Sequence, residues 1–391
     1  MEDVFIVGAA RTPIGSFNGA LAALPAPRLG AAAVAEAVRR AGLRPEQVDE
    51  IVMGNVLAAG MGQAPARQAG IGGGLPHSVA AVTVNKVCGS GLKAILLGQQ
   101  AILTGDAEIV VAGGMESMTN APYLLPKARQ GYRMGDGVLV DSMVHDGLTD
   151  AYNPVHMGVC GEMCAERYGI GREEQDRFAV QSYTRALECQ AAGRFADEIV
   201  PVKVPGRKGE VVVAEDEEPK RGDTARFGSL RPAFKEGGTI TAANSPSVND
   251  GGAAVVLASR RKVEELGLEP LARMGASATA ALAPEWFTIA PGEAVQKALK
   301  RAELGVKDID LFEVNEAFSV VALVAARVLG IGEDRLNVNG GAVALGHPIG
   351  CTGARLVVTL LHAMRARRAR RGLTALCLGG GEGMALILER P

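Results

Sequence analysis

Short apolar runs alternate along the chain with alanine-rich stretches in which apolar residues recur at helical spacing. The short runs match buried strands, whereas the longer stretches match helices that bury one face. This alternation is typical of an α/β protein with a parallel or mostly parallel sheet and helices on its faces. The predicted strands are residues 4–8, 51–57, 81–85 and 109–114, and the predicted helices are residues 29–41 and 89–104.

The same succession of elements returns from about residue 270, and three segments of the first part align in order with three of the second. VDEIVMGNVL (48–57) aligns with IDLFEVNEAF (309–318), VNKVCGSG (84–91) with VNGGAVALGHP (338–348), and VVAGG (110–114) with LCLGG (376–380). Their nearly constant separation indicates an internal repeat. We therefore predict two similar βαβ-type α/β halves, an N-terminal one formed by residues 1–118 with 249–270 and a C-terminal one formed by residues 271–391.

Residues 119–248 form an insertion in the first half. This segment is richer in polar residues, proline and charge, and residues 171–193 within it have the pattern of an amphipathic helix that ends at Gly193. Strand character returns at residues 247–259. An insertion of this size on an α/β sheet usually forms a layer that holds a ligand. We predict an inserted loop domain that contacts substrate.

The balance of charge and the cysteine pattern exclude several classes of function. The 391 residues carry 41 Lys and Arg against 43 Asp and Glu, so no overall basic field attracts nucleic acid or a membrane surface. No segment approaches the roughly 18 apolar residues of a membrane helix, and the start of the chain does not resemble a signal peptide. Six scattered cysteines without metal-ligand spacing indicate reduced thiols and no metal site. We expect a cytoplasmic protein.

The strongest local signal for chemistry is VNKVCGSGLKAI (84–95), in which Cys88 lies between a predicted strand and a predicted helix. The dipole and free N–H groups of a helix N-terminus favour the thiolate, and the small residues that follow leave room for a substrate. The position alone is equally compatible with an inert buried cysteine. GSGLKA (89–94) also fits a dinucleotide-binding pattern, but it does not follow the first strand of the chain, which argues against a dehydrogenase.

Three further segments place polar or reactive side chains at the ends of predicted strands. His347 lies in a glycine-rich loop before a predicted helix, where a general base could be presented. Cys377 ends a strand and precedes Gly379, whose N–H could bind an oxyanion. Asn315 lies at a strand-to-helix turn and could simply cap the helix. Open α/β sheets form their sites at such strand ends, so we expect these segments to face each other across the two halves.

Taken together, the motifs resemble the thiolase family. VNKVCGSGLKAI, GGMESMTNAPYLL, HMG (156–158), NEAF (315–318), GGAVALGHPIG and CLGGGEG occur in the order of that family. The resemblance as a whole extends from residue 4 to residue 388. The resemblance implies a five-layered αβαβα fold of two similar halves with an inserted loop domain that contacts coenzyme A. It also implies an acyl-CoA acyltransferase, most similar to the acetoacetyl-CoA type, and a homo-oligomer, either a dimer or a tetramer.

The reaction implied by the resemblance is a reversible Claisen condensation of two acetyl-CoA to acetoacetyl-CoA and CoA, or the thiolysis of a 3-ketoacyl-CoA. In this ping-pong reaction Cys88 is the nucleophile that becomes acylated, His347 activates it, and Cys377 exchanges the α-proton of the second acyl-CoA. Asn315 holds a water that forms one oxyanion hole with His347, and the N–H groups of Cys88 and Gly379 form the other. No resident cofactor or metal is implied, because CoA thioesters are the substrates.

The same resemblance suggests the residues that contact substrate. Those expected to line the pantetheine and acyl pocket are Leu148, His156, Met157, Phe234 and Phe318. The family's serine contact with CoA falls at Pro246 here, so Ser245 or Ser247 would have to replace it. Lys220 and Arg221 are candidates to bind phosphate, although a solvated charge cluster is an equal alternative.

Two other functions share these motifs. A ketoacyl synthase-like condensing enzyme uses one cysteine with two histidines or a histidine and an asparagine, so Cys377 argues against it. A non-catalytic lipid-carrier homologue of thiolases typically lacks one of the reactive residues. This chain has all four of them, namely Cys88, Asn315, His347 and Cys377.

Overall fold

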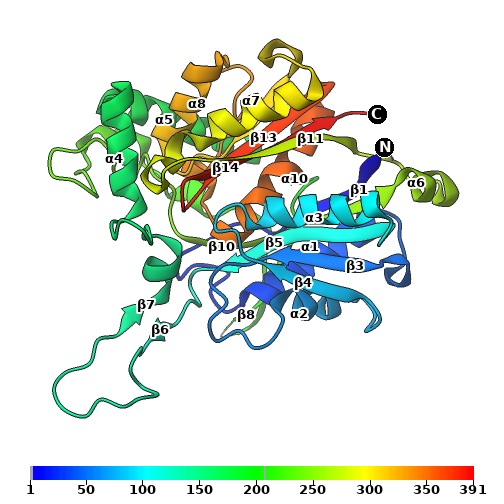
Figure 1. The fold of residues 1–391 in the computed structure, drawn as a ribbon, viewed down its shortest axis with the longest axis horizontal. Helices are drawn as coiled ribbons and strands as arrows, with labels where there is room; N and C mark the ends of the chain where they lie inside the picture. Colours follow the sequence, from blue (N-terminus) through cyan, green and yellow to red (C-terminus); the bar gives the residue numbers. More distant parts are fainter. Residues whose placement is uncertain (1–2, 207) are drawn as a thin grey trace.

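The computed structural model describes residues 3–206 and 208–391, in which one ten-stranded sheet dominates (Figure 1). Its order is β12-β13-β14-β11-β1-β10-β5-β3-β4, with β2 beside β10. The strands are β1 (Val4–Arg11), β2 (Gly15–Ser16), β3 (Glu50–Gly54), β4 (Ala80–Val84), β5 (Ile109–Ser117), β10 (Asn249–Ser259), β11 (Ala272–Ala281), β12 (Leu311–Val314), β13 (Arg371–Leu378) and β14 (Glu382–Glu389). Only Phe5 and Ile6 of β1 pair with β11, so the sheet consists of two halves joined by a narrow seam.

The helices complete five layers, and this confirms the predicted fold class. Helices α3 (Ser90–Thr104) and α10 (Ile349–Arg367) lie between the two half-sheets (Figure 1). The outer face of the first half is covered by α1 (Ala26–Arg40) and α2 (Pro65–Gly72), and that of the second by α7 (Ala290–Ala302) and α8 (Ser319–Leu329). Two short helices, α6 (Arg260–Leu266) and α9 (Ala342–Leu345), lie in connections.

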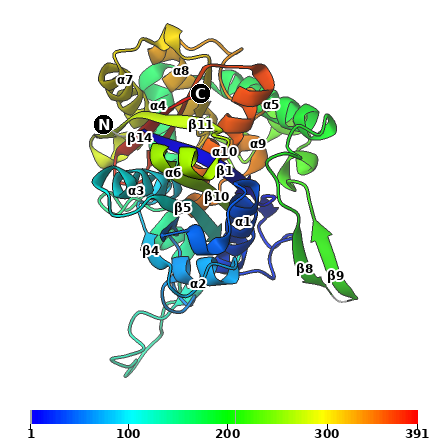
Figure 2. The ribbon, with the colours of Figure 1, turned by 90° about the vertical axis from the view of Figure 1, so that its right-hand side faces the viewer.

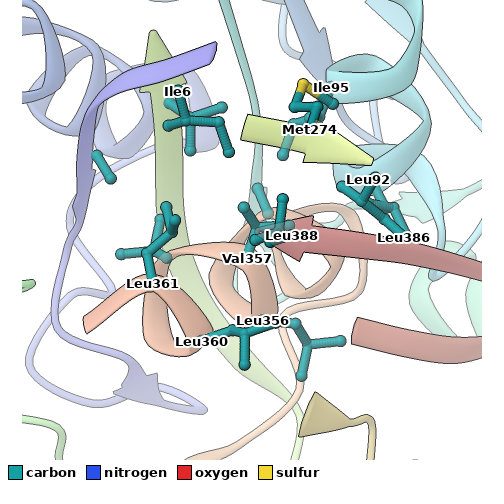
Figure 3. Packing of buried hydrophobic residues seen from close by; sticks show 14 of the residues in the cluster. Ile6, Leu92, Ile95, Met274, Leu356, Val357, Leu360, Leu361, Leu386 and Leu388 are labelled. Atoms are coloured by element: carbon teal, nitrogen blue, oxygen red, sulfur yellow. The ribbon is translucent and has the colours of Figure 1, made fainter. Parts of the chain in front are cut away.

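The central layer is the most apolar part of the molecule because its helices are covered on both sides. The side chains of this core come from α3, α10 and the strands above and below, among them Leu92, Ile95, Leu356, Leu386 and Leu388 (Figure 3). Burial of each such side chain contributes about 1.5–3 kcal/mol. The two helices that begin beside the predicted site are therefore firmly held.

The predicted direction of the strands is only partly right. Strands β3, β4 and β5 pair in parallel, as do β12 and β13, but β1, β10, β11 and β14 pair antiparallel to their neighbours. The reason is the connections: β13 and β14 are joined by the short turn Gly379–Gly381, which can only produce an antiparallel hairpin. The sheet is mixed.

The insertion contains two helices and two hairpins. These are α4 (Met157–Tyr168), α5 (Arg172–Ala191), β6 (Tyr123–Leu124) with β7 (Val140–Asp141), and β8 (Val202–Gly206) with β9 (Gly209–Val213). The β6–β7 hairpin projects from the body in Figure 1, and the β8–β9 hairpin projects in Figure 2. The buried guanidinium of Arg11, at the end of β1, anchors the insertion through ion pairs of 2.6 Å with Glu198 and 2.7 Å with Asp216. Across the two described ranges, no helix is both long and apolar enough to cross a membrane.

Candidate active site

The four chemistry-bearing segments converge at one end of the central layer. Cys88 precedes the first turn of α3, and His347 lies one residue before the N-cap of α10. Asn315 directly follows β12, and Cys377 lies next to the last residue of β13. The two helices and two strands thus bring together side chains that are up to 289 positions apart in the sequence.

A cavity of about 210 Å³ marks this meeting point. It is lined by the predicted residues Cys88, Leu148, His156, Met157, Phe234, Ser245, Ser247, Phe318, His347 and Gly379, and also by Met118, Gly147, Pro246, Val248, Phe287, Ala317 and Ile349. A larger cavity of about 530 Å³ lies at the other end of α10, beside His362 and the C-terminus, and contains none of the predicted residues. Chemistry rather than size therefore identifies the smaller cavity as the candidate site.

Cys88 follows a strained residue. Val87 has φ of 46°, a left-handed conformation that is rare for a β-branched residue and costs about 1–3 kcal/mol. The turn is held by hydrogen bonds from Val87 N to Asn85 Oδ1 (3.0 Å), from Ser90 Oγ to Val87 O (2.6 Å), and from Lys86 N to Ser90 Oγ (2.8 Å). This local framework places the Cys88 sulfur at the cavity wall.

The expected shift in the pKa of Cys88 toward the thiolate is wrong. Burial raises the pKa of the Cys88 thiol to about 11, and the backbone N–H groups of Gly379 and of Cys88 itself only partly oppose this effect. Desolvation by the surrounding loops outweighs the helix N-terminus, because burial disfavours a charged sulfur. Cys88 is a thiol at neutral pH, and it needs a base when it attacks.

His347 is arranged to be that base. Its Nδ1 lies 2.6 Å from Oγ1 of Thr352, and this hydroxyl donates its only proton to the carbonyl of Pro348 at 3.0 Å. Nδ1 must therefore carry the ring hydrogen, which leaves the lone pair on Nε2. Burial, assisted by the charge of Arg355, lowers the pKa of His347 to about 3, so the imidazole is neutral at pH 7.

Thr352→Val is expected to lower the rate of Cys88 acylation roughly 10- to 100-fold, part of the contribution of a general base. The variant keeps the shape of the side chain but removes the acceptor for Nδ1–H, so the ring loses its fixed tautomer. Stopped-flow measurement of acyl-enzyme formation tests this expectation. Thr359→Val, a buried threonine further along α10 that donates to Glu198, is the matched control. A wild-type rate in Thr352→Val would contradict the assignment.

Two glycines allow α3 and α10 to approach each other backbone to backbone. A Cβ atom on Gly353 would lie 2.5 Å from the backbone N of Leu92, and one on Gly91 would lie 2.7 Å from the backbone N of Ala354. Larger residues would force the helices apart, together with the thiol and the imidazole that precede them. The chain contains 51 glycines, and these two have a specific use at this site.

Asn315 lies against the imidazole. It is fully buried, its Nδ2 lies 3.5 Å from Nε2 of His347, and its Oδ1 has no hydrogen-bond partner within the described ranges. A buried carbonyl oxygen without a partner is costly unless it accepts a hydrogen bond. This side chain is therefore placed to hold a small donor beside His347.

The β13–β14 turn supplies the opposite wall. The side chain of Cys377 is 1% exposed, and burial, together with the nearby Cys88, raises the pKa of its thiol well above the usual value. The N–H of Gly379, at the start of the same turn, contacts the Cys88 sulfur. An ion pair between Lys86 and Glu382 ties the Cys88 turn to this hairpin. The thiols of Cys88 and Cys377 thus lie close together, beside the backbone N–H groups of Cys88 and Gly379.

Aromatic side chains of the insertion and of the second half form the outer wall. The ring of His156 stacks on Phe234 with centroids 4.7 Å apart, and Phe234 meets Phe318 edge to face at 5.9 Å. Nδ1 of His156 accepts a hydrogen bond from Gly158 N, which leaves Nε2–H as a donor. A Cβ on Gly158 would collide with the Phe234 ring at 2.3 Å, so the glycine permits this stacking.

The two serines that flank Pro246 already have internal partners. Ser245 Oγ donates to the carbonyl of Thr241 at 2.7 Å, and Ser247 Oγ donates to Asn249 Oδ1 at 3.0 Å. Both hydroxyls keep lone pairs that can accept a hydrogen bond, and both residues line the cavity together with Pro246.

Lys220 and Arg221 do not line the cavity. Lys220 forms an ion pair with Glu215, and Arg221 lies 3.7 Å from Glu217, with more than half of each basic side chain exposed. The structure brings the other predicted residues together but leaves these two on the surface.

Sequence reasoning missed Thr352, and it gave no role to Phe287 or to Glu116. Thr352 could have been found from its place on the first turn of the helix after His347, whereas the wall formed by Phe287 depends on tertiary packing. In the parts of the chain that the structure covers, no group of three or more His, Cys, Asp or Glu side chains is placed to hold a metal ion.

Comparison with known proteins gives concordant matches. The profile described as "Thiolase, N-terminal domain" matches residues 4–261, and "Thiolase, C-terminal domain" matches residues 268–390. The chain is 54% identical over 391 residues to a protein of Chromobacterium violaceum named acetyl-CoA acetyltransferase, with all of both chains covered. It is similarly 54% identical over 392 residues to the acetyl-CoA acetyltransferase of Cupriavidus necator, again over 100% of each chain. For acetyl-CoA acetyltransferase 1 of Arabidopsis thaliana the identity is 52%, covering 99% of this chain and 94% of the relative.

Proposed function

The chain belongs to the thiolase family, and from this premise we propose that it catalyses the reversible condensation of two acetyl-CoA to acetoacetyl-CoA and CoA. The observation that carries the proposal is the convergence of the Cys88 thiol, a neutral imidazole and two backbone N–H donors at one small cavity, with the buried thiol of Cys377 close to Cys88. A sulfur nucleophile attacks a thioester readily and also leaves from one readily, so the acyl group can be transferred in either direction.

Acyl transfer to Cys88 begins with loss of its proton to Nε2 of His347. The thiol needs this base because its pKa is about 11, and the imidazole can serve because it is neutral. In the thiolysis direction the sulfur attacks the keto carbon of a 3-ketoacyl-CoA. The oxygen of the resulting tetrahedral intermediate is stabilised by the N–H groups of Cys88 and Gly379, which already contact the sulfur.

Cleavage of the carbon–carbon bond leaves an acyl group on Cys88 and an acetyl-CoA enolate. The enolate carbon takes the proton of Cys377, a thiol that its raised pKa keeps protonated until this step. The enolate oxygen is stabilised by the protonated Nε2 of His347 and by a water held by Asn315. CoA thiol then returns a proton to Cys377 and displaces Cys88, which regains its own proton from His347. Condensation is the reverse sequence, and no resident cofactor or metal takes part.

Substrate binding is assigned to the insertion and the loop before β10. Leu148, Met157, Phe234 and Phe318 supply apolar walls for the pantetheine and acyl groups. His156 and the serines on either side of Pro246 supply polar contacts, and the cationic side chains of Lys220 and Arg221 remain candidates for the phosphates of CoA.

The test is thiolysis of acetoacetyl-CoA by the purified protein, measured as the fall in enolate absorbance after CoA is added. Turnover that depends on both substrates is the expected result. Binding of acyl-CoA without turnover would instead favour a lipid-carrier function. A series of 3-ketoacyl-CoA substrates of increasing length should show the highest kcat/KM for four carbons, because the cavity of about 210 Å³ limits the acyl group.

We further propose a homo-oligomer, a dimer or a tetramer, in the cytoplasm. Strand β4 is an edge strand with Val82 44% exposed, and such an edge readily pairs with another chain. The β6–β7 hairpin exposes Met134 and Val138 to 97% and 71%. All six cysteines are free thiols, as a reducing compartment requires.

Light scattering after size exclusion should therefore give a mass that is a multiple of 40.4 kDa. Val82→Lys should reduce this mass, since a charge on the edge strand opposes pairing. Val328→Lys, at a 49% exposed position on α8, is the control that should leave the mass unchanged. A wild-type mass equal to that of one chain would contradict the proposal.

A further inference from the structure

Glu116 lies at the end of β5 and is fully buried, yet no cation is paired with it in the described ranges. Its carboxylate instead accepts four N–H donors. Asn55 Nδ2 (2.7 Å) and Leu57 N (3.2 Å) bind Oε1, and Val56 N and Gly350 N (both 3.0 Å) bind Oε2. A buried carboxylate costs several kcal/mol unless it is satisfied in this way, so the arrangement holds three residues of one loop and a helix end at fixed positions.

One side of this network leads to the nucleophile. Val56 donates its N–H to Glu116, and its carbonyl oxygen accepts a hydrogen bond from Asn85 Nδ2 at 3.4 Å. Asn85 Oδ1 in turn accepts from Val87 N, the strained residue directly before Cys88. The Cys88 turn is thus linked to Glu116 through two hydrogen-bonded groups.

The other side leads to the base. Gly350 is in the first turn of α10, two residues before Thr352, the residue that fixes the tautomer of His347. The contact is tight, because a Cβ on Gly350 would lie 2.7 Å from Glu116 Oε2. The helix dipole also stabilises a carboxylate at a helix N-terminus, the position that Glu116 occupies beside α10.

We propose that Glu116 is a positioning residue for the reaction: in its ionised form it fixes the Cys88 turn relative to the N-terminus of α10, and so fixes Cys88 relative to His347. The role rests on the proposed function and adds to it a group that contacts neither substrate nor the reacting atoms. A neutral side chain cannot replace it, since an amide has one acceptor oxygen for four N–H donors.

The titration of Glu116 supplies a readout that distinguishes this role from a structural one. Burial raises the pKa of Glu116 to about 7, against the effect of its N–H donors and with a smaller contribution from Asp250 on β10. The other ionisable groups beside it are the thiols of Cys88 and of Cys351 on α10, whose pKa values lie near 11 and 12. With the pKa of His347 near 3 and that of Cys377 well above its usual value, no catalytic group changes charge near neutral pH, whereas Glu116 does. Glu313, whose pKa burial raises to about 8, faces Arg355 on α10 and not Glu116.

The experiment compares Glu116→Gln with the wild type in thiolysis of acetoacetyl-CoA between about pH 6 and pH 8. A misplacement of catalytic groups by about 1 Å can lower the rate by up to about 100-fold. Wild-type kcat should fall as pH decreases through about 7, because protonation removes acceptors. Glu116→Gln should lower kcat about 10- to 100-fold at pH 8, leave KM unchanged and abolish the acidic limb. Glu162→Gln, a buried carboxylate on α4 that accepts N–H donors from Thr239 and Ile240, is the matched control.

A second variant keeps the inference testable if Glu116→Gln does not fold. Asn55→Ala removes one of the four donors and should move the acidic limb to higher pH, because fewer hydrogen bonds stabilise the carboxylate. An acidic limb that persists in Glu116→Gln, or that stays in place in Asn55→Ala, would overturn the role of Glu116. Lack of turnover in the wild type would instead overturn the proposed function.

Discussion

Cys88→Ala is expected to abolish acylation of the protein and to lower turnover by roughly 10⁴-fold or more, as loss of a nucleophile does in other enzymes with covalent intermediates. The cavity, the imidazole and the backbone donors would remain, but no sulfur would be left to carry the acyl group between the two half-reactions. Incubation with acetyl-CoA followed by mass spectrometry of peptides should show an acetyl group on Cys88 of the wild type and none on the variant.

Cys189→Ala is the matched control for this experiment. Cys189 is a fully buried thiol on α5, in a separate part of the core, so its removal should leave acylation unchanged. An acetyl group on another cysteine, or full turnover by Cys88→Ala, would show that the covalent intermediate forms elsewhere.

The position of Cys88 could be predicted from sequence because it depends on local order. A strand, a short turn and a helix follow one another within residues 80–104, and the periodicity of the helix is clear. The protonation state of Cys88 could not be predicted. It depends on how far the loops of the insertion and of the second half exclude water from the sulfur, and those loops are distant in the sequence.

The position of His347 could also be predicted from sequence, but its hydrogen-bond partner could not. Its place before a helix was evident, but the contact with Thr352 depends on how the first turn of α10 is oriented. Glu116 lies in one of the recognised motifs, yet its four donors come from segments about 60 and 234 residues away. Hydrogen-bond networks of this kind arise from tertiary packing, and a single sequence does not report them.

The fold itself was largely predictable, apart from strand direction. Apolar periodicity located β1, α3, β5, α5 and β10 to within a few residues, because burial determines that pattern. Pairing direction depends instead on the connections between strands. The insertion separates β5 from β10, and only the folded chain shows that these two strands run antiparallel along nine paired residues.

Cys377→Ala is expected to separate the two half-reactions. The variant should still become acetylated at Cys88, since the base His347 and the donors at Cys88 and Gly379 remain. It should no longer exchange the α-protons of acetyl-CoA with solvent, and condensation should fall roughly 10²- to 10⁴-fold, the usual contribution of a positioned acid or base. Incubation with acetyl-CoA in D₂O, followed by mass spectrometry of the acetyl group, measures the exchange directly.

The control for Cys377→Ala must account for the small cavity that loss of a buried thiol leaves. Cys164→Ala serves this purpose, because Cys164 lies in the same apolar cluster as Cys377 and is also fully buried. It belongs to α4 and contacts Thr288, whereas Cys377 is close to Cys88. Cys164→Ala should exchange α-protons at the wild-type rate. If Cys377→Ala also does so, the proton must move through another group, with His347 as the nearest alternative. Loss of exchange in Cys377→Ala alone would assign the carbon acid step to the second thiol, whose burial keeps its proton in place until an enolate forms beside it.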